Sequence, residues 1–421
     1  MNNAIFNSLE SNVRSYCRTF PRVFDRALGA MIWDEDGNEF IDFFAGAGTM
    51  NYGHNNPYIK GRVLEFLVED RILHALDMHT VAKRNFLETF ERRVLQPKGM
   101  VYKVQFTGPT GTNAVEAALK IARRVKGRTN IFAFTGGFHG MSLGALSVTA
   151  NTESRAAAGV PLGHGAFLPY PSNIGGVEGS LIALERILTD THSGVDKPAA
   201  VILETVQAEG GVNPAPVEWL RGVEAICRTH DLCLIVDDIQ VGCFRTKEFF
   251  SFESAGISPD LVILSKSIGG IGFPMSLVLI KPELDIWGPG EHTGTFRGNQ
   301  IAFVAAAAAL DFAAETDLPS QVRRHEEMVM NFLETRIAPL HEAIKVRGRG
   351  LIWGVDMTGV GGGAIAKRIG IRCFANGLVI ERAGRDDAVL KLLPPLTIAD
   401  DILQRGLDIL HQAIADELGA T

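Results

Sequence analysis

Short runs of apolar residues recur through the middle of the chain, and their spacing predicts strands that alternate with helices. Several are continuous runs of Val, Ile and Leu, which is typical of parallel strands covered on both faces. Val115, Ala118 and Leu119 share one face of a predicted helix over residues 112–124, with charged residues opposite. The alternation over residues 56–300 predicts an open, mostly parallel sheet. The predicted strands cover residues 101–106, 130–134, 200–206, 232–237, 261–265 and 276–280, and a second helix covers residues 217–229.

The two ends of the chain carry different patterns. Residues 30–34 and 39–44 flank a short polar segment with a glycine, which predicts a β-hairpin. Residues 318–421 alternate long charged helices with short strands, for example at residues 351–357 and 389–393. We therefore expect the two ends to pack together into one α+β unit.

The length of 421 residues is natural for one large and one small domain. The expected fold class is α/β. The large domain is expected at residues 56–310, and residues 1–55 and 311–421 are expected to form the smaller domain together.

Composition excludes several classes of protein. Hydrophobic residues make up 46% and charged residues 21%, as in ordinary globular enzymes. The net charge of −7 without a long basic run argues against nucleic acid as a partner. No apolar stretch is long enough to span a bilayer, and the first residues do not resemble a signal peptide. Five cysteines without a CxxC pair argue against a disulfide framework or a zinc site, so we expect a cytoplasmic protein.

Charged residues stand at the ends of two predicted buried strands. The strand at residues 232–236 runs into Asp237 and Asp238, and the strand at residues 261–265 runs into Lys266. Open α/β sheets bind ligands at the carboxyl ends of their strands. A buried charge needs a partner, so the pattern fits a functional site. A structural salt bridge or simple exposure in the loops fits the strands equally well.

The sequence around these residues carries a more specific signal. Residues 237–242 read Asp-Asp-Ile-Gln-Val-Gly, and Lys266, which follows Asp237 by 29 residues, stands just before a Gly-Gly pair. This resembles the signature of the class III (ω-) aminotransferases. Asp238 stands where that family usually has Glu, which keeps the charge on a shorter side chain. The resemblance implies the type I fold of pyridoxal-phosphate (PLP) transferases, with PLP as cofactor.

The resemblance assigns a role to each residue of the signature. Lys266 carries the cofactor as a Schiff base and moves a proton between substrate and cofactor, which needs an amine of lowered pKa. Asp237 faces the pyridine nitrogen and keeps it protonated, so that the ring stays electron-poor. Gln240 is expected to hydrogen-bond the phenolic oxygen of the ring.

Two further motifs are assigned to the cofactor. Gly111 and Thr112 begin a predicted helix, where backbone amides can bind a phosphate, although a Gly-Thr at a helix start is more often only a cap. The resemblance makes them the phosphate cup, with Asn113 where the family often has Glu. Phe138 and His139 follow a predicted strand and would ordinarily be core residues. In the family, this aromatic residue stacks on the pyridine ring and the histidine lies beside it.

Three more residues concern the substrate and a neighbouring subunit. Glu209 matches the family's gating glutamate, which pairs with a distant arginine until a dicarboxylate arrives. Lys391 stands at the position of that arginine and lacks its bidentate fork. A surface lysine is the alternative. Thr295 matches a segment that touches the phosphate of the partner subunit, which implies a homodimer or a dimer of dimers with shared active sites.

The resemblance covers nearly the whole chain, including residues 34–37 and 51–57. Residues 10–26 and 391–395 are most similar to a subfamily of ectoine biosynthesis. Its members transfer an amino group from L-glutamate to L-aspartate 4-semialdehyde, giving 2-oxoglutarate and L-2,4-diaminobutyrate. Potassium as an activator is also implied. Met141 stands where ornithine-type relatives have Arg, so the residue that binds the distal carboxylate of glutamate is unassigned.

Other functions remain open at this point. The nearest is another ω-aminotransferase, acting on ornithine, acetylornithine or 4-aminobutyrate, followed by a PLP aminomutase or decarboxylase. A nicotinamide-dependent oxidoreductase is suggested only by the glycine-rich residues 359–363, which lack a following acid at the right distance. A non-catalytic binding protein would not require Lys266.

Overall fold

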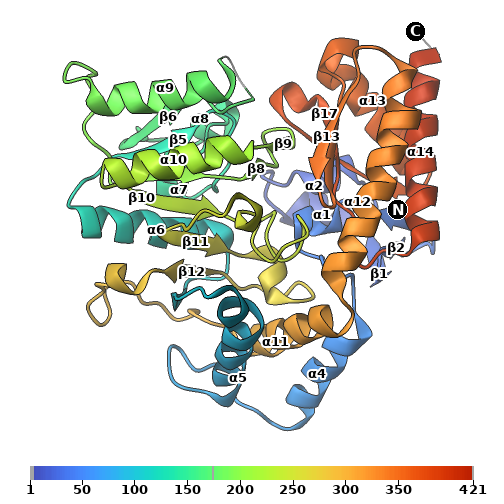
Figure 1. The fold of residues 1–421 in the computed structure, drawn as a ribbon. Coiled ribbons are helices and arrows are strands. Elements are labelled where there is room, and N and C mark those ends of the chain that lie inside the picture. The colour runs from blue at the N-terminus through green and yellow to red at the C-terminus, as the bar shows by residue number, and fades with distance from the viewer. Residues whose placement is uncertain (1–3, 173–174, 420–421) are drawn as a thin grey trace.

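The computed structural model, drawn in Figure 1, describes residues 4–172 and 175–419. Its centre is a sheet of seven strands in the order β4-β12-β11-β10-β7-β5-β6. Strand β12 is antiparallel to both its neighbours, and the strands from β11 to β6 are parallel. The strands are β4 (Lys103–Phe106), β5 (Ile131–Phe134), β6 (Gly165–Leu168), β7 (Ala200–Leu203), β10 (Cys233–Asp237), β11 (Leu261–Leu264) and β12 (Leu277–Ile280). The expected mostly parallel sheet of an α/β fold is confirmed.

Helices cover both faces of this sheet, because successive side chains of its strands point to opposite sides. Leu234 on β10 belongs to an apolar cluster with α10 (Val217–Thr229), and its neighbour Ile235 belongs to another with α6 (Gly111–Lys126). The central strands are therefore buried on both sides, which explains their uninterrupted apolar sequence. Further helices of this part are α4 (Pro57–Val68), α5 (Val81–Phe90), α9 (Gly176–Thr189) and α11 (Gln300–Glu315).

The two ends of the chain share a second region, seen at the right of Figure 1, where blue and red segments meet. One sheet has the order β1-β2-β3-β15, and its last pair joins the two ends in parallel. The other has the order β13-β14-β17-β16. These elements are β1 (Phe24–Leu28), β2 (Met31–Asp34), β3 (Glu39–Asp42), β13 (Lys345–Arg349), β14 (Ile352–Asp356), β15 (Leu378–Val379), β16 (Glu381–Ala383), β17 (Val389–Leu392), α12 (Leu318–Phe332), α13 (Gly362–Ala375) and α14 (Asp400–Gly419).

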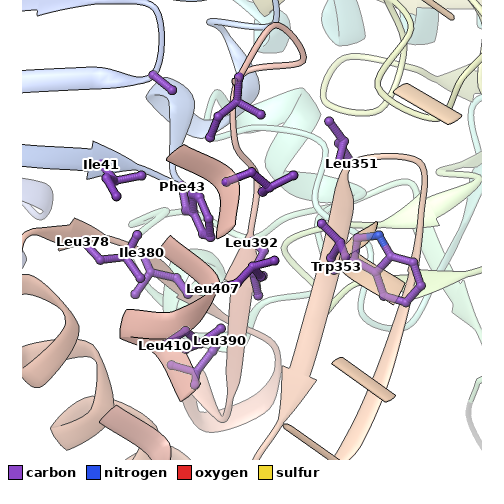
Figure 2. Packing of buried hydrophobic residues seen from close by; sticks show 14 of the residues in the cluster. Ile41, Phe43, Leu351, Trp353, Leu378, Ile380, Leu390, Leu392, Leu407 and Leu410 are labelled. Carbon is purple, nitrogen blue, oxygen red and sulfur yellow. The ribbon is translucent and has the colours of Figure 1, made fainter. Parts of the chain in front are cut away.

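A shared core holds the two ends together. Ile41 and Phe43 from the N-terminal segment pack with Leu390, Leu392 and Leu407 in one buried cluster (Figure 2). An added Cβ at Gly406 of α14 would lie 2.4 Å from the Phe43 ring, so the helix packs closely on that ring. Burial of this apolar surface stabilises the contact by about 25 cal/mol for each Å² removed from water.

Most elements expected from the sequence are present. All six predicted strands are confirmed, as are the hairpin of β2 and β3 and the helix over residues 217–229. Strand β6 was missed because its four residues include Gly165 and carry no long apolar run. The domain boundaries at residues 55 and 310 stay a prediction. Among the described helices, none is long and apolar enough to cross a bilayer.

Candidate active site

The carboxyl ends of two adjacent parallel strands meet at a cavity of about 190 Å³. Asp237 is the last residue of β10, and Lys266 follows β11 after a single serine. Because open α/β sheets bind ligands at this edge, the cavity is the candidate active site. Eight of the residues singled out from the sequence line it: Gly111, Thr112, Phe138, His139, Glu209, Asp237, Gln240 and Lys266.

Two residues singled out from the sequence do not line this cavity. Thr295 is exposed on the segment before α11, where its carbonyl accepts a hydrogen bond from His74 Nε2 at 3.0 Å. Lys391 lies behind the cavity wall on β17, and its side chain is 0% exposed. The alternative of a surface lysine at position 391 is therefore wrong, because the side chain lies inside the sheet edge among carboxylates.

The Lys266 amine is enclosed at the cavity. Its Nζ donates a hydrogen bond to the Ala47 carbonyl at 2.8 Å. Burial lowers the pKa of Lys266, and the positive charge of Lys391 lowers it further, although Glu209 opposes this. The backbone at Lys266 has a φ of 53°, in the left-handed region that a side chain disfavours. The site therefore holds an amine with a lowered proton affinity, which is what a nucleophilic lysine requires.

An unusual turn supplies the acceptor for this amine. Ala45, Gly46, Ala47 and Gly48 all have positive φ, at 49°, 58°, 56° and 82°. Left-handed backbone costs a non-glycine residue about 1 kcal/mol or more, so surrounding contacts must hold the turn in place. The turn points the Ala47 carbonyl into the site, where it accepts from both Lys266 and Gln240 Nε2, the latter at 2.9 Å. The N-terminal segment thus completes the cavity.

A buried acid–imidazole pair lies across the cavity. Asp237 Oδ2 is 2.7 Å from His139 Nδ1, and both side chains are buried. Burial alone would lower the pKa of His139, but the hydrogen bond and charge of Asp237 outweigh it and raise the pKa. A carboxylate at this position could stabilise a positive group that faces it.

Glu204 is a buried acid that we did not assign from the sequence. Its Oε1 accepts from the Phe138 amide at 2.9 Å, and its Oε2 accepts from the Ala208 amide at 3.4 Å. Burial raises the pKa of Glu204 to about 7. Glu204 therefore fixes the backbone that carries Phe138, the residue expected to stack on the cofactor ring.

A cluster of three charged side chains lies at the wall of the cavity near Glu209. The ammonium of Lys391 lies 2.7 Å from Glu209 Oε1 and 2.8 Å from Glu381 Oε2. Burial alone would lower the pKa of Lys391, but the two carboxylates outweigh it and raise the pKa. Burial would raise the pKa of Glu209, yet Lys391 and Lys266 lower it to about 2. The expected pairing of positions 209 and 391 is present, and Glu381 is an addition that the sequence motifs did not indicate.

The start of α6 forms the end of the cavity suited to an anion. A Cβ at Gly111 would lie 2.8 Å from Ile239 Cδ1, and one at Gly140 would lie 2.5 Å from Thr112 Oγ1. The Thr112 hydroxyl lies 2.6 Å from the Ser142 hydroxyl. Glycine is thus required for this close packing, and Gly111, Thr112 and Gly140 line the cavity at the N-terminus of α6, which is a common arrangement for binding phosphate.

Two buried polar oxygens near the strand end have no hydrogen-bond partner within the described part of the chain. They are Gln240 Oε1 and Asp238 Oδ1. Gln240 lines the cavity, and its amide nitrogen donates to Glu209 Oε1 at 3.1 Å. Asp238 Oδ2 accepts from the Ser251 amide at 3.1 Å, and burial raises the pKa of Asp238 to about 7. The Gln240 oxygen is thus free to meet a bound group.

A larger cavity of about 860 Å³ adjoins the first and shares Phe138 and Glu209 with it. Its walls come from the sheet edge on one side and from residues 382–387 on the other. The Gly384 amide donates to the Glu209 carbonyl at 2.9 Å, which ties the two walls together. The larger cavity therefore lies next to the one that Lys266 lines.

The described residues support neither a dinucleotide-binding loop nor a metal site. An added Cβ at Gly363 would lie 1.8 Å from the Asp386 carbonyl oxygen, so the last glycine of the segment at residues 359–363 packs against protein rather than facing a dinucleotide. Within residues 4–172 and 175–419, no group of three or more His, Cys, Asp or Glu side chains could hold a metal ion.

Comparison with known proteins gives concordant results. The family model described as "Aminotransferase class-III" matches residues 13–414. The diaminobutyrate–2-oxoglutarate transaminase of Bordetella parapertussis is 55% identical over 416 residues, which cover 98% of this chain and 95% of that protein. The enzyme of the same name from Streptomyces coelicolor is 52% identical over 419 residues, or 98% of each chain.

Solved structures agree on the fold. The ornithine aminotransferase of Toxoplasma gondii, with partial occupancy of PLP at its active site, superposes with a TM-score of 0.86 at 25% identity. That match covers 98% of this chain and 93% of the other. An aminotransferase of Bacillus anthracis superposes with a TM-score of 0.87 at 21% identity and covers 99% and 100%.

Proposed function

Because the chain belongs to the class-III aminotransferase family, we propose that it transfers the amino group of L-glutamate to L-aspartate 4-semialdehyde. The products are 2-oxoglutarate and L-2,4-diaminobutyrate, and the reaction is the first step of ectoine biosynthesis. The observation that carries the proposal is the cavity lined by Lys266, Asp237 and Glu209, with Lys391 paired to Glu209 behind the cavity wall. The two transaminases of 55% and 52% identity support the choice of substrates.

The residues of the cavity fit pyridoxal 5′-phosphate. The start of α6 at Gly111 suits its phosphate, with Thr112 and Gly140 beside it on the cavity. The unpartnered Gln240 Oε1 is available for the hydroxyl group of the ring. Phe138 and His139 would lie against the ring, and Asp237 would face its nitrogen. When bound, the cofactor supplies an electron sink for the substrate carbon next to nitrogen.

The chain's own residues perform the remaining steps. Lys266, with its lowered pKa, holds the cofactor and then takes and returns the proton of the substrate carbon. Asp237, held in place by its hydrogen bond with His139, would stabilise a positive ring nitrogen. Glu204 and the turn at Ala47 hold these groups in position.

The ion pair of Glu209 and Lys391 distinguishes the two amino compounds of the reaction, L-glutamate and L-2,4-diaminobutyrate. Glutamate reacts at a carbon that carries a carboxylate, and this carboxylate takes the place of Glu209 on Lys391. The terminal amine of L-2,4-diaminobutyrate sits on a carbon without a carboxylate, so Glu209 stays on Lys391 in that half-reaction. The 2.7 Å contact between Nζ and Oε1 supports this exchange.

The proposal also covers the oligomeric state of the protein and its cellular compartment. Leu73, Leu76, Met78 and Phe296 are exposed apolar side chains, and Phe296 neighbours Thr295. We propose that they lie in the interface of a homodimer or of a dimer of dimers. In this interface Thr295 reaches the partner's cofactor phosphate. The described cysteines are all free, which suits the cytoplasm.

Potassium is proposed as an activator of the enzyme. The test is to replace potassium by sodium in the assay.

The test of the function is a visible spectrum of the purified protein with added amino donors. L-Glutamate and L-2,4-diaminobutyrate should each convert the bound cofactor to its amine form, and ornithine should do so far more slowly. Borohydride reduction and peptide mapping should then find the cofactor on Lys266. Exchange with ornithine but not with L-2,4-diaminobutyrate would move the assignment to an ornithine-type enzyme.

A further inference from the structure

The Lys391 ammonium is held by two carboxylates that differ in their surroundings. Glu209 follows β8 (Val206–Gln207) and lines both cavities. Glu381 lies on β16 directly opposite Lys391 on β17 in the antiparallel register, and it lines neither cavity. Its side chain is 10% exposed, compared with 30% for Glu209. One carboxylate therefore faces the substrate side, and the other belongs to the same rigid sheet as the lysine.

We propose that Glu381 is a positioning residue that fixes the Lys391 ammonium while Glu209 and a substrate carboxylate exchange places on it. The inference rests on the proposed function and extends it to a residue outside the family motifs discussed above. Lys391 then stays in one place through both half-reactions, and Glu209 is the only member of the cluster that moves.

The chemistry of lysine explains why a second acid is needed. An arginine in this position could hold a carboxylate with two parallel hydrogen bonds and a planar fork. An ammonium is a point charge at the end of a flexible stem, so one departing partner would leave it buried, unpaired and free to shift. Glu381 keeps one 2.8 Å contact in place when the 2.7 Å contact to Glu209 breaks.

The net charge of Lys391, Glu209 and Glu381 also supports a fixed Glu381 and an exchanging Glu209. Lys391 with Glu381 and Glu209 carries one net negative charge when all three are ionised. Replacing the Glu209 carboxylate by that of a substrate leaves two carboxylates on one ammonium. The exchange therefore avoids a step in which a buried cation stands alone.

The test compares Glu381→Gln and Glu381→Asp with the wild type, all loaded with cofactor. Glu253→Gln is the matched control, because Glu253 pairs with Lys98 at 2.7 Å in a similarly enclosed position away from the cavity. Single-turnover spectra give each half-reaction separately. For Glu381→Gln we expect a 10- to 100-fold rise in the concentration of glutamate needed for half-maximal rate. The half-reaction of L-2,4-diaminobutyrate should change less than threefold, and Glu381→Asp should restore part of the loss.

A binding measurement gives a readout apart from turnover. Glutarate, a dicarboxylate without an amine, should bind to Glu381→Gln at least tenfold more weakly by calorimetry. Glu381→Asp keeps the negative charge and should recover part of that affinity.

The outcomes separate this inference from the proposed function. A wild type that does not accept glutamate would defeat the proposed function itself. A wild type that accepts glutamate, combined with an unchanged glutarate affinity in Glu381→Gln, overturns the role of Glu381. Equal losses in both half-reactions also overturn it, because they would indicate a general structural effect.

Discussion

Replacement of Glu204 by Gln should make the protein more stable at alkaline pH, although it removes a charge beside the active site. Glu204 is 7% exposed, and its carboxylate accepts hydrogen bonds from two backbone amides, the closer being that of Phe138 at 2.9 Å. Glutamine keeps an oxygen that can accept the Phe138 bond. The substitution therefore mimics the protonated acid and leaves the local backbone in place.

The size of the effect follows from the pKa. Burial raises the pKa of Glu204 from 4.5 to about 7. Below pH 4.5 the acid is protonated in folded and unfolded chains, so it has no pH-dependent effect there. Between pH 4.5 and 7 the unfolded chain loses its proton first, and folding stability falls until the cost reaches about 3 kcal/mol above pH 7. At pH 5 the cost is only about 1 kcal/mol.

Urea unfolding of Glu204→Gln and wild type at pH 5 and pH 8 checks this reasoning. The gain in the free energy of unfolding should be about 2 kcal/mol larger at pH 8 than at pH 5. Glu88→Gln is a control, because Glu88 lies on α5 with a side chain 68% exposed and should show no such difference. A gain of the same size at both pH values, or a loss that grows with pH, would refute a buried acid of raised pKa at position 204.

Three further substitutions test the site. Lys266→Ala should abolish turnover and the borohydride-stable cofactor label, and retained activity would contradict the assignment. Asp237→Asn should lower kcat by at least 100-fold with unchanged circular dichroism, because the neutral amide no longer stabilises a positive ring nitrogen; near-normal rates would point to another partner. Gly140→Ala should weaken cofactor binding at least tenfold in a fluorescence titration, since φ is 123° and the new Cβ would lie 2.5 Å from Thr112 Oγ1. Unchanged affinity would mean that this loop does not adjoin the phosphate.

The sequence indicated that Asp237 and Lys266 lie close together, because the signals for this are local. A continuous apolar run marks a strand covered on both faces, and the polar residue after it marks the sheet edge. Asp237 and Lys266 were found in this way, and the cavity brings them together. The motif around Glu209 and Lys391 also led to a pair that is in contact in the structure.

The residues that were missed depend on pairing between distant segments. Glu381 gains its importance only because β16 lies opposite Lys391 in the antiparallel register. The Ala47 carbonyl reaches Lys266 through a turn of four positive φ angles, which an Ala-Gly-Ala-Gly sequence permits but does not specify. The burial of Lys391 could not be predicted either, because a charged residue within a strand usually faces solvent.

The parallel pair of β3 and β15 has a consequence for biosynthesis of the protein. Ile41 lies beside Leu378, so the first sheet lacks this strand until the ribosome has added the 337 residues from position 41 to position 378. At roughly 5–20 residues per second, the nascent N-terminal strands wait on the order of tens of seconds for it. Since the turn after β3 carries the acceptor for Lys266 and Phe43 donates to the Val379 carbonyl, the complete pocket for vitamin B6 can form only after β15 has been synthesised.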